Sequence, residues 1–499
     1  MKRIQFNNSY DIEKILEIIL AFNGVSDRTV LLSIILTNMM EITGSDAGTV
    51  YTIENGKLHF RILQNKTLGI FQSSEKEEIS LPPISLDERN IKNISAYCAI
   101  NNEAVIIDDV YTRNTLFNFD GPKKYDELTG YRTKAMVVLP ICTQRDEENE
   151  VLGVIQMMNP IHPQTGEIDS YGDINDSTIL PALTKVAANT LSNLTQVKEM
   201  QLFLRSFAIA MTQAIDERSH YNSSHTKNVA MYCERFAKYL SNRFPKGHHF
   251  YFDKLHAESL TLAALLHDVG KVITPLDIMD KANRLGNRLE SVRYRFDLKK
   301  AQLEIEYLKN QITPTEYEQT LNELDVAMEF VEQVNTISFL DGKYFPDILA
   351  LKNMTFKNRA GYTERLLSPE EIEALSVIKG TLTAGERRIM EEHVEITNRI
   401  LAEIPFWKYY ADVPEWAGCH HEFLDGTGYP KGLVGDEIPM EACIISIMDI
   451  FDALIATDRP YKKGVPVEKA LEILQDMVKE GKLHKELVAL FSESKIWEE

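Results

Sequence analysis

The segment Leu260-Thr261-Leu262-Ala263-Ala264-Leu265-Leu266-His267-Asp268-Val269-Gly270-Lys271 decides which fold this sequence predicts. Its first seven residues form an apolar run that predicts a buried helix, and this run ends in an adjacent histidine and aspartate. An isolated His-Asp pair is typically a core histidine held by a salt bridge. The pair indicates a functional site only if further histidines and carboxylates accompany it.

Such side chains occur on both sides of this segment. His225 stands at the head of a predicted helix, His393 lies within another, and His420–Pro430 is a dense polar block. Further on, Asp449 and Asp452 are three residues apart in an otherwise apolar helical run. Two carboxylates on one face of an apolar helix are costly to bury unpaired. We therefore expect a metal or another cation to compensate at least one of them.

Composition limits what the chain can do. Its 499 residues exceed one compact domain, and at about 100–200 residues per domain two to four domains are expected. The proportions of hydrophobic (44%) and charged (26%) residues are those of soluble globular domains and exclude a disordered or fibrous chain. The formal charge of −20 repels nucleic-acid polymers and anionic membranes, although a small anion in a local basic pocket is compatible with it.

Targeting signals and cysteines point to a cytoplasmic protein. The first residues, Met1–Asn8, lack the apolar core of a signal peptide, and no apolar run approaches the roughly 20 residues of a membrane span. The five cysteines are odd in number and form no CxxC pair. We expect reduced thiols and no membrane span.

Residues 20–195 read as one α/β module. A helical stretch at 29–43 precedes several strand-like runs that are separated by turn signals, and a helix pattern at 176–193 closes the module. The expected strands are 48–53, 58–63, 104–107, 134–140 and 152–158.

This order resembles a GAF domain, a sensory module with a small-molecule pocket over its sheet. Cyclic-nucleotide-binding GAF domains carry an Asn-Lys-x-x-x-Asp-Glu signature after the strand. The corresponding place here holds Asn159-Pro160-Ile161-His162, without the lysine. The ligand of this module is therefore unknown, and a cyclic nucleotide is not expected.

A linking helix is expected over residues 179–217, because this stretch lacks glycine and has proline only at position 181. Apolar residues recur along it at spacings of three and four. The helix either packs on its own domain or pairs across a homodimer, as linkers between sensor and effector modules often do.

The remaining chain, from about residue 207, is mainly helical, and 476–499 reads as a C-terminal helical tail. Residues 286–380 are expected to form a mostly helical insertion with charged amphipathic helices at 288–308 and 315–334. Thr315 with Glu318 has the pattern of a capping box for the second helix, and further capping boxes are expected at Ser368 and Thr383. The insertion is either a solvated arm or a contact for a partner or a second copy.

The blocks of histidine and aspartate resemble the HD superfamily of metal-dependent phosphohydrolases, specifically its HD-GYP branch, over residues 207–475 without the insertion. The motifs that carry the resemblance are His267-Asp268-x-Gly-Lys271, His420-His421-Glu422-x-x-Asp425-Gly426-x-Gly428-Tyr429-Pro430, Asp449-x-x-Asp452-Ala453-Leu454 and Asp458-Arg459-Pro460-Tyr461. The implied fold is multi-domain: an α/β GAF sensor domain followed by an all-α HD-GYP domain with a long helical insertion. The implied activity is bacterial hydrolysis of cyclic di-GMP to pGpG or GMP through a metal-bridged hydroxide, under GAF control.

The resemblance also implies two divalent metal ions. Asp268 would bridge them; His225, His267 and Asp449 would complete one site, and His393, His420 and His421 the other. Two metals about 3.5–4 Å apart suit phosphodiester hydrolysis, since they supply hydroxide and neutralise phosphate charge. Mixed imidazole and carboxylate ligands suit Fe, Mn, Ni or Zn, with Fe or Mn favoured, and the lack of cysteine argues against structural zinc. A third metal is implied in some members; Asp216 stands where the family usually has glutamate.

Contacts to the substrate are expected from a few side chains. Lys271 would face the phosphate as a point charge, and Arg459 and Lys462 would supply the remaining cations. Gly428 would let the backbone approach the ligand, and Asp452 is placed near it. Tyr429 would stack on a guanine, orient the loop or simply pack.

Three other functions remain open. The first is hydrolysis of 3′,3′-cyclic GMP-AMP instead of cyclic di-GMP, since both substrates belong to this branch. A catalytically weak protein that binds a cyclic dinucleotide is the second alternative, although all metal positions are filled. An HD phosphohydrolase for another nucleotide is the third, and the intact Gly428-Tyr429-Pro430 argues against it.

Overall fold

The structure, a computed structural model, describes residues 10–23, 25, 27–74, 79, 81–112, 116–145, 148–171, 179–218, 224–456 and 464–498. The chain divides into two compact units, 1–203 and 204–499. Their boundary falls within helix α5 (Ile179–Asp216), which runs from one unit into the other.

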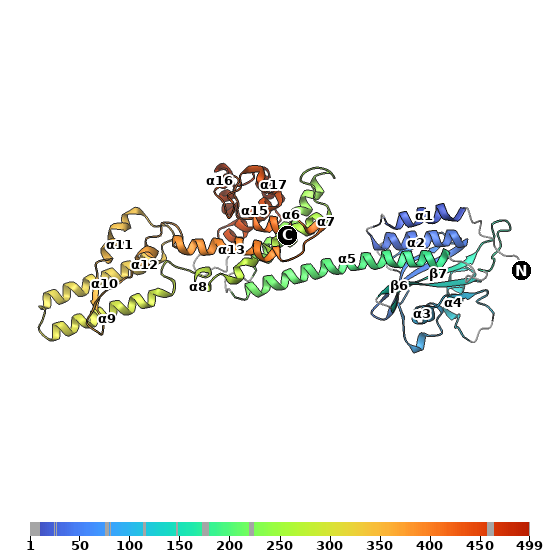
Figure 1. The fold of residues 1–499 in the computed structure, drawn as a ribbon, viewed down its shortest axis with the longest axis horizontal. Coiled ribbons are helices and arrows are strands. Elements are labelled where there is room, and N and C mark those ends of the chain that lie inside the picture. Colours follow the sequence, from blue (N-terminus) through green and yellow to red (C-terminus); the bar gives the residue numbers. More distant parts are fainter. Residues whose placement is uncertain are drawn as a thin grey trace. The chain divides into compact units, whose positions relative to one another are not determined.

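The first unit is built on an antiparallel sheet whose strands follow the order β3-β2-β1-β7-β6-β5, with β4 paired to β2 (Figure 1). A tight turn joins β1 to β2: Asn55 and Gly56 both have positive φ (50° and 69°), as a two-residue hairpin requires. The strands are β1 Ser45–Glu54, β2 Lys57–Asn65, β3 Ile70–Ser73, β4 Ile84–Ser85, β5 Val105–Ile107, β6 Met136–Arg145 and β7 Glu148–Pro160.

Helices cover both faces of this sheet (Figure 1). One face packs against α1 (Tyr10–Asn23), α2 (Arg28–Thr43) and the first part of α5, and the other against α3 (Ile94–Asn101) and α4 (Asp120–Thr129). Alternation along β7 follows this division: Ile155 and Met157 join the first core, and Val154 the second.

All five expected strands are present, with longer bounds for most, and the α/β fold class is confirmed. The sequence interpretation missed α1, α3, α4 and the short strands β3 and β4. These elements have ten residues or fewer, apart from α1, and the periodic signal over such lengths is weak. The start of the expected closing helix, at Asp176, lies outside the described residues.

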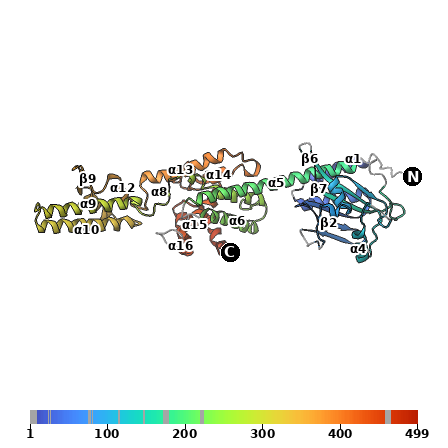
Figure 2. The same ribbon diagram turned by 90° about the horizontal axis from the view of Figure 1, so that it is seen from below.

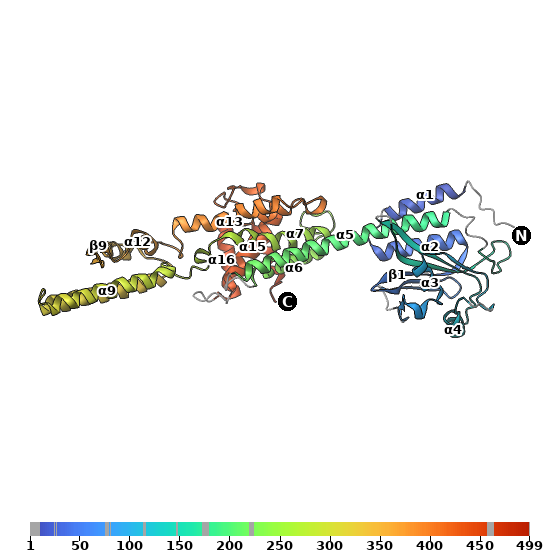
Figure 3. The ribbon, with the colours of Figure 1, turned by 60° about the horizontal axis from the view of Figure 1, so that its bottom comes forward.

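The second unit is mainly helical, as predicted, and its helices pack around the apolar helix α15 (Figure 3). On α6, the buried side chains Val229, Cys233, Phe236 and Leu240 recur at helical spacing and form the face that meets this core. The helices are α6 His225–Arg243, α7 Lys254–Leu266, α8 Leu276–Met279, α13 Ala384–Ala402, α14 Val413–Gly418, α15 Met440–Ile455, α16 Val467–Lys479 and α17 Lys485–Ser494.

The segment inserted between α8 and α13 has a hydrophobic core of its own, which includes Phe296, Leu324 and Val331. Its helices α9 (Leu289–Leu308) and α10 (Pro314–Thr336) lie side by side as a hairpin (Figures 1 and 2). Two shorter helices pack beside the hairpin, α11 (Phe345–Leu351) and α12 (Pro369–Leu375). The two-stranded sheet of β8 (Thr355–Lys357) and β9 (Thr363–Arg365) was not expected from the sequence.

One capping prediction was wrong. Helix α10 begins at Pro314, and its N-cap is Thr313, paired with Glu316 in a capping box. Proline is favourable in the first turn because it needs no hydrogen-bond acceptor there, so the N-cap lies two residues before the expected Thr315. The capping boxes at Ser368 and Thr383 are present as predicted.

The root of the insertion is tied to the first turn of α13. Lys281 Nζ lies 2.6 Å from Glu386 Oε2, and Glu386 also closes the capping box of α13. Beside this ion pair the guanidinium of Arg284 is fully buried and donates to the carbonyl oxygens of Ile337 (3.1 and 2.9 Å) and Val377. Burial lowers the pKa of Arg284. Both ends of the insertion are thus joined through one side chain.

None of the described helices combines the length and the apolar character needed to cross a membrane.

The separate core of the insertion predicts a local stability effect. Phe296→Ala should cost about 3–5 kcal/mol in the opening free energy of the α9–α10 hairpin, because Phe296 is fully buried in that core. Hydrogen-exchange mass spectrometry of α9 and α10 peptides measures this. The matched control is Tyr362→Ala, an aromatic residue of the insertion that is 72% exposed and should change protection little. Equal loss of protection in both variants would contradict the assigned core.

Candidate metal centre

Three histidines in the second unit share one hydrogen-bonding arrangement. His267, His393 and His420 each place Nδ1 against the backbone carbonyl three residues earlier, at 2.7, 2.6 and 2.6 Å. A carbonyl oxygen can only accept, so Nδ1 carries the proton in each ring. Each Nε2 therefore keeps a free lone pair.

These lone pairs converge without partners. Nε2 of all three histidines and Oδ1 of Asp268 are buried and have no hydrogen-bond partner among the residues that the structure describes. Asp268 lies among them: its Oδ1 is 3.3 Å from His393 Nε2, and its Oδ2 is 3.3 Å from His267 Nε2. Buried acceptors without a donor are costly, and a divalent cation would satisfy several of them at once. The donor set fits a metal.

A second group of donors adjoins the first. One candidate ligand atom from each of His225, His267 and Asp449 lies within 4.8 Å of the others. His225 Nε2 is 2.9 Å from Asp449 Oδ1, while its Nδ1 is 2.6 Å from Asp452 Oδ2. Burial alone would lower the pKa of His225, but the hydrogen bonds to both aspartates outweigh it and raise the pKa to about 9. Burial would likewise raise the pKa of Asp449, yet His225 holds it well below its usual range.

His393, His420 and His421 form another such group within 4.8 Å. Burial is the main cause that lowers the pKa of His421 to about 3, and it lowers that of His420 well below its usual value. Both rings are therefore neutral near pH 7, which is the form that binds a metal. The structure thus brings together all seven side chains that the sequence proposed as ligands.

Close contact between two elements sets this geometry. The amide of Gly270 donates to Thr397 Oγ1 (2.9 Å) on α13, and this hydroxyl donates to the carbonyl of His267 (3.1 Å). A Cβ atom on Gly270 would collide with the carbonyl oxygen of His393. The glycine of the His-Asp-x-Gly-Lys motif therefore lets α13 bring His393 up to Asp268.

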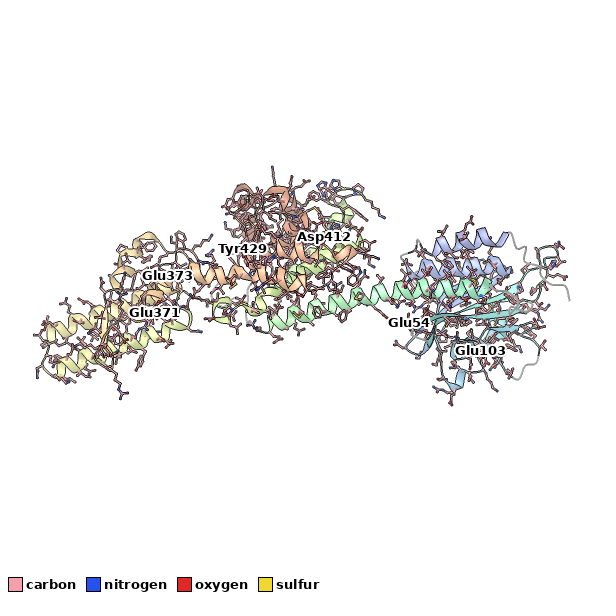
Figure 4. The ribbon with its side chains drawn as sticks, in the orientation of Figure 1. Glu54, Glu103, Glu371, Glu373, Asp412 and Tyr429 are labelled. Atoms are coloured by element: carbon pink, nitrogen blue, oxygen red, sulfur yellow. The ribbon has the colours of Figure 1, made fainter. Side chains whose placement is uncertain are left out.

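A buried carboxylate shapes the loop that follows His421. Glu422 accepts from the backbone amides of Lys431 (2.7 Å) and Leu433 (3.0 Å). A Cβ on Gly428 would overlap the backbone at Glu422, so this position also requires glycine. The loop places the ring of Tyr429, labelled in Figure 4, 4.8 Å from that of His421. The role of Glu422 was missed, although it stands directly after two predicted ligands.

The structure places the predicted substrate residues differently. Lys271 Nζ is 2.5 Å from Asp268 Oδ2, so its ammonium pairs with the carboxylate instead of standing free. Asp452 is buried behind His225, and its second oxygen accepts from Asn228 (3.0 Å). Asp452 therefore orients the His225 ring, and its contact with substrate stays a prediction. Arg459 and Lys462 lie outside the described residues.

Two further residues of the site were not predicted, Asn228 and Thr397. Asn228 stands one helical turn after His225, and Thr397 one turn after His393, so helical spacing could have found both. Asp216, proposed for a third metal, is buried and its Oδ2 has no hydrogen-bond partner. Burial is the main cause that raises its pKa to about 6.

Comparisons with known proteins agree with this architecture. A GAF domain model matches residues 27–171, and two HD domain models match residues 222–315 and 360–487. The chain thus contains regions that match GAF and HD domain models. The two HD segments contain every ligand candidate of the two metal groups, and residues 316–359 of the insertion lie outside both.

Curated relatives match only part of this chain. A 3′3′-cGAMP-specific phosphodiesterase 3 of Vibrio cholerae is 45% identical over 97 residues, which is 19% of this chain and 20% of that protein. A cyclic di-GMP phosphodiesterase of Thermotoga maritima is 39% identical over 107 residues, 21% of this chain and 27% of that protein. The chain thus spans about a quarter or less of the lengths of these relatives.

Solved structures align with the first part of the chain. The GAF domain of an Acinetobacter phosphoenolpyruvate-protein phosphotransferase gives a TM-score of 0.28 at 11% identity and covers 40% of this chain and 99% of that one. A GAF domain/HD domain protein from Geobacter sulfurreducens gives 0.24 at 13% identity, over 35% and 98%.

The close approach at Gly270 predicts a sharp effect of one methyl group. Gly270→Ala should lower the free energy of unfolding by about 1–3 kcal/mol and reduce metal content, because α13 must shift away. Denaturant titration and elemental analysis measure both. The control is Gly385→Ala on α13, where an added Cβ meets nothing within 4 Å. A Gly270 variant as stable as the Gly385 variant would contradict this packing.

The Asp452–His225 hydrogen bond predicts an effect on metal affinity. Asp452→Asn should weaken Mn²⁺ binding by about 10–100-fold, because the histidine loses its charged orienting partner. Calorimetric titration of metal-free protein measures this. Glu441→Gln is the matched control: Glu441 also bonds a histidine (His256, 2.7 Å) but lies outside the ligand groups. Equal affinities in the two variants would remove the assigned role of Asp452.

Proposed function

We propose that this protein is a metal-dependent phosphodiesterase that hydrolyses cyclic di-GMP to a linear product. One observation carries the proposal: the buried, unpartnered Nε2 atoms of His267, His393 and His420 converge on Asp268. The relatives matched over part of the chain include cyclic di-GMP phosphodiesterases of Thermotoga maritima and Xanthomonas campestris.

The residues would hold two divalent ions, with Fe or Mn favoured by the mixed imidazole and carboxylate donors. When bound, these ions supply a deprotonated water and neutralise charge on the phosphate oxygens. Asp268 would bridge the two sites because its oxygens face different histidines, His393 on one side and His267 on the other. Asp216, buried with an unpaired oxygen, is the proposed ligand of a third ion.

Lys271 would change partner during this process. Its ammonium pairs with Asp268 Oδ2 at 2.5 Å. With Asp268 holding a cation, Lys271 would no longer be needed as its partner and would be available to a phosphate oxygen. Tyr429, beside His421, would pack against the nucleotide at the same edge of the site. Gly428, with no side chain, packs against the backbone of residues 421–423 and so lets the loop that carries Tyr429 fold close to His421.

A second substrate is supported by a separate observation. Three of the relatives are named 3′3′-cGAMP-specific phosphodiesterases, among them one that is 45% identical over 97 residues. We therefore propose 3′,3′-cyclic GMP-AMP as the alternative substrate. A catalytically weak cyclic-dinucleotide-binding protein is the remaining alternative, and the complete ligand set argues against it.

Regulation would pass from the GAF domain through α5, which is one uninterrupted helix of 38 residues. We propose that an unidentified GAF ligand sets the output and that α5 pairs with its equivalent in a homodimer. Val197 (58% exposed) and Met200 (43%) support this pairing, since apolar side chains at helical spacing remain open to solvent.

Turnover tests the proposed activity. Metal-loaded full-length protein should convert cyclic di-GMP, and His267→Ala or Asp268→Ala should reduce the rate by about 100-fold or more, since each removes a ligand. Chromatography of products from both cyclic dinucleotides measures this, and elemental analysis of the same samples reports metal loss.

The control for turnover is His248→Ala. His248 stacks on Phe244 (4.3 Å between ring centroids) and belongs to none of the ligand groups, so both rate and metal content should be unchanged. Unaltered turnover in the His267 and Asp268 variants would refute the assigned centre. Binding of a cyclic dinucleotide without hydrolysis would favour the binding protein.

A further inference from the structure

Helix α9 of the insertion has an apolar face besides the one that joins its core. The inward residues are Val292, Phe296 and Leu303, all buried. The second face consists of five residues that we call the α9 stripe: Tyr294, Leu298, Ala301, Ile305 and Leu308. Leu298 is half-buried and also contacts the core of the insertion, whereas the other four are exposed. Tyr294, Ile305 and Leu308 are 69%, 50% and 70% exposed. An exposed apolar row of this length on a surface helix indicates a contact.

The spacing of the α9 stripe indicates what kind of contact. Its members follow one another at intervals of four, three, four and three residues, which is the repeat of a coiled-coil seam. A seam with this repeat packs best against another helix with the same repeat. A second α9 provides one.

Charges beside the stripe favour self-pairing in one orientation. Acidic residues follow one flank at seven-residue intervals, namely Glu290, Asp297 and Glu304. The other flank carries basic or neutral residues at the same interval, namely Arg288, Arg295, Gln302 and Lys309. Parallel helices place one flank against the opposite flank of the partner, whereas antiparallel helices place acid against acid.

Some of these groups are already engaged within the subunit. Glu290 pairs with Arg293 (2.6 Å), and Arg295 with Glu371, which is labelled in Figure 4. Within the described part of the chain, Asp297, Glu304 and Lys309 have no ion-pair partner. In a parallel pair in register, Glu304 of each copy faces Lys309 of the other, so these free charges neutralise one another.

The insertion presents α9 as a fixed surface. Lys300 on α9 binds Asp325 on α10 (2.5 Å), and Arg293 binds Glu332 (2.7 Å). Together with Arg295 and Glu371, these pairs hold α9 against α10 and α12. Little conformational freedom is therefore lost when the stripe is covered.

We propose that the α9 stripe is a self-association surface that pairs in parallel with the α9 of a second copy of this chain. The seam is short, so the contact is weak by itself and gains from any other contact that joins the same two copies. It is separate from the proposed pairing through α5 and does not depend on catalysis. Its occupant is another α9, because that helix supplies both the matching repeat and the complementary flanks.

Cysteine cross-linking tests the pairing and its direction. In full-length protein, Leu308→Cys should form a disulfide-linked dimer under mild oxidation, because parallel pairing places the two Leu308 positions face to face. The matched control is Val326→Cys on α10, which is 57% exposed but lies off the stripe, and it should remain at the background of the unmodified chain. The five native cysteines contribute to both backgrounds equally.

A charge variant provides an independent measurement. Ile305→Glu with Leu308→Glu should raise the dimer dissociation constant by about tenfold or more in sedimentation, since like charges meet in the seam. Both positions are exposed, so circular dichroism should be unchanged. Val326→Glu should leave the constant as it is.

Two results would overturn the proposal. In the first, Leu308→Cys forms no more disulfide-linked dimer than Val326→Cys does, whatever the oligomeric state of the protein in solution. The other is preferential cross-linking of Tyr294→Cys to Leu308→Cys, which is the product of antiparallel pairing. If Val197→Glu disrupts the dimer and Leu308→Cys forms no cross-link, the chain pairs through α5, and the proposed α9 contact is refuted. A monomeric chain in which Leu308→Cys still cross-links above background would support it without α5.

Discussion

The second unit holds a cluster of buried histidine and aspartate acceptor atoms that have no hydrogen-bond donor among the described residues, and its other elements are arranged around this cluster. Nε2 of His267, His393 and His420 and Oδ1 of Asp268 face one another in a region whose described residues offer no hydrogen-bond donor to them. An apolar core would tolerate such a group only at a cost of several kcal/mol. The surrounding elements nevertheless hold each ring in place, through an Nδ1 hydrogen bond to its own backbone. The unit is therefore built for a cation that resolves this excess of acceptors.

The same arrangement explains features that look unrelated along the chain. Gly270 permits contact with α13, Thr397 bridges that contact, and Asp452 orients His225 from behind. None of the three is a proposed ligand. Each fixes the direction of a ligand atom, and small errors in such directions matter because metal coordination depends strongly on geometry.

The cluster of histidines and aspartates could be anticipated from the sequence because its motifs resemble those of the HD superfamily and because two carboxylates in an apolar helix are costly to bury unless a cation compensates them. The role of these residues as ligands is a proposal. The expected strands were found because β1 and β7 are long and turn residues such as Asn55-Gly56 separate the strand-like runs. Short elements such as α3 and β4 leave too little pattern. The pairing of Lys271 with Asp268 was not foreseeable, because it depends on the three-dimensional position of one ammonium group. Thr313 was overlooked as a cap because Thr315 offers the same local spacing.

Arg284 has a consequence for how the ligands assemble during folding. Asp268 and His393 are 125 positions apart, and the 95 residues 286–380 account for most of that separation. Because the insertion has its own core and Arg284 joins its two ends, it can fold first and leave an effective loop of about a quarter of that length. Loop closure costs about 0.6 kcal/mol for each doubling of length, so this saves roughly 1 kcal/mol of chain entropy when the two halves of the centre meet. The insertion therefore adds little to the entropy that the chain loses when the two halves of the domain come together.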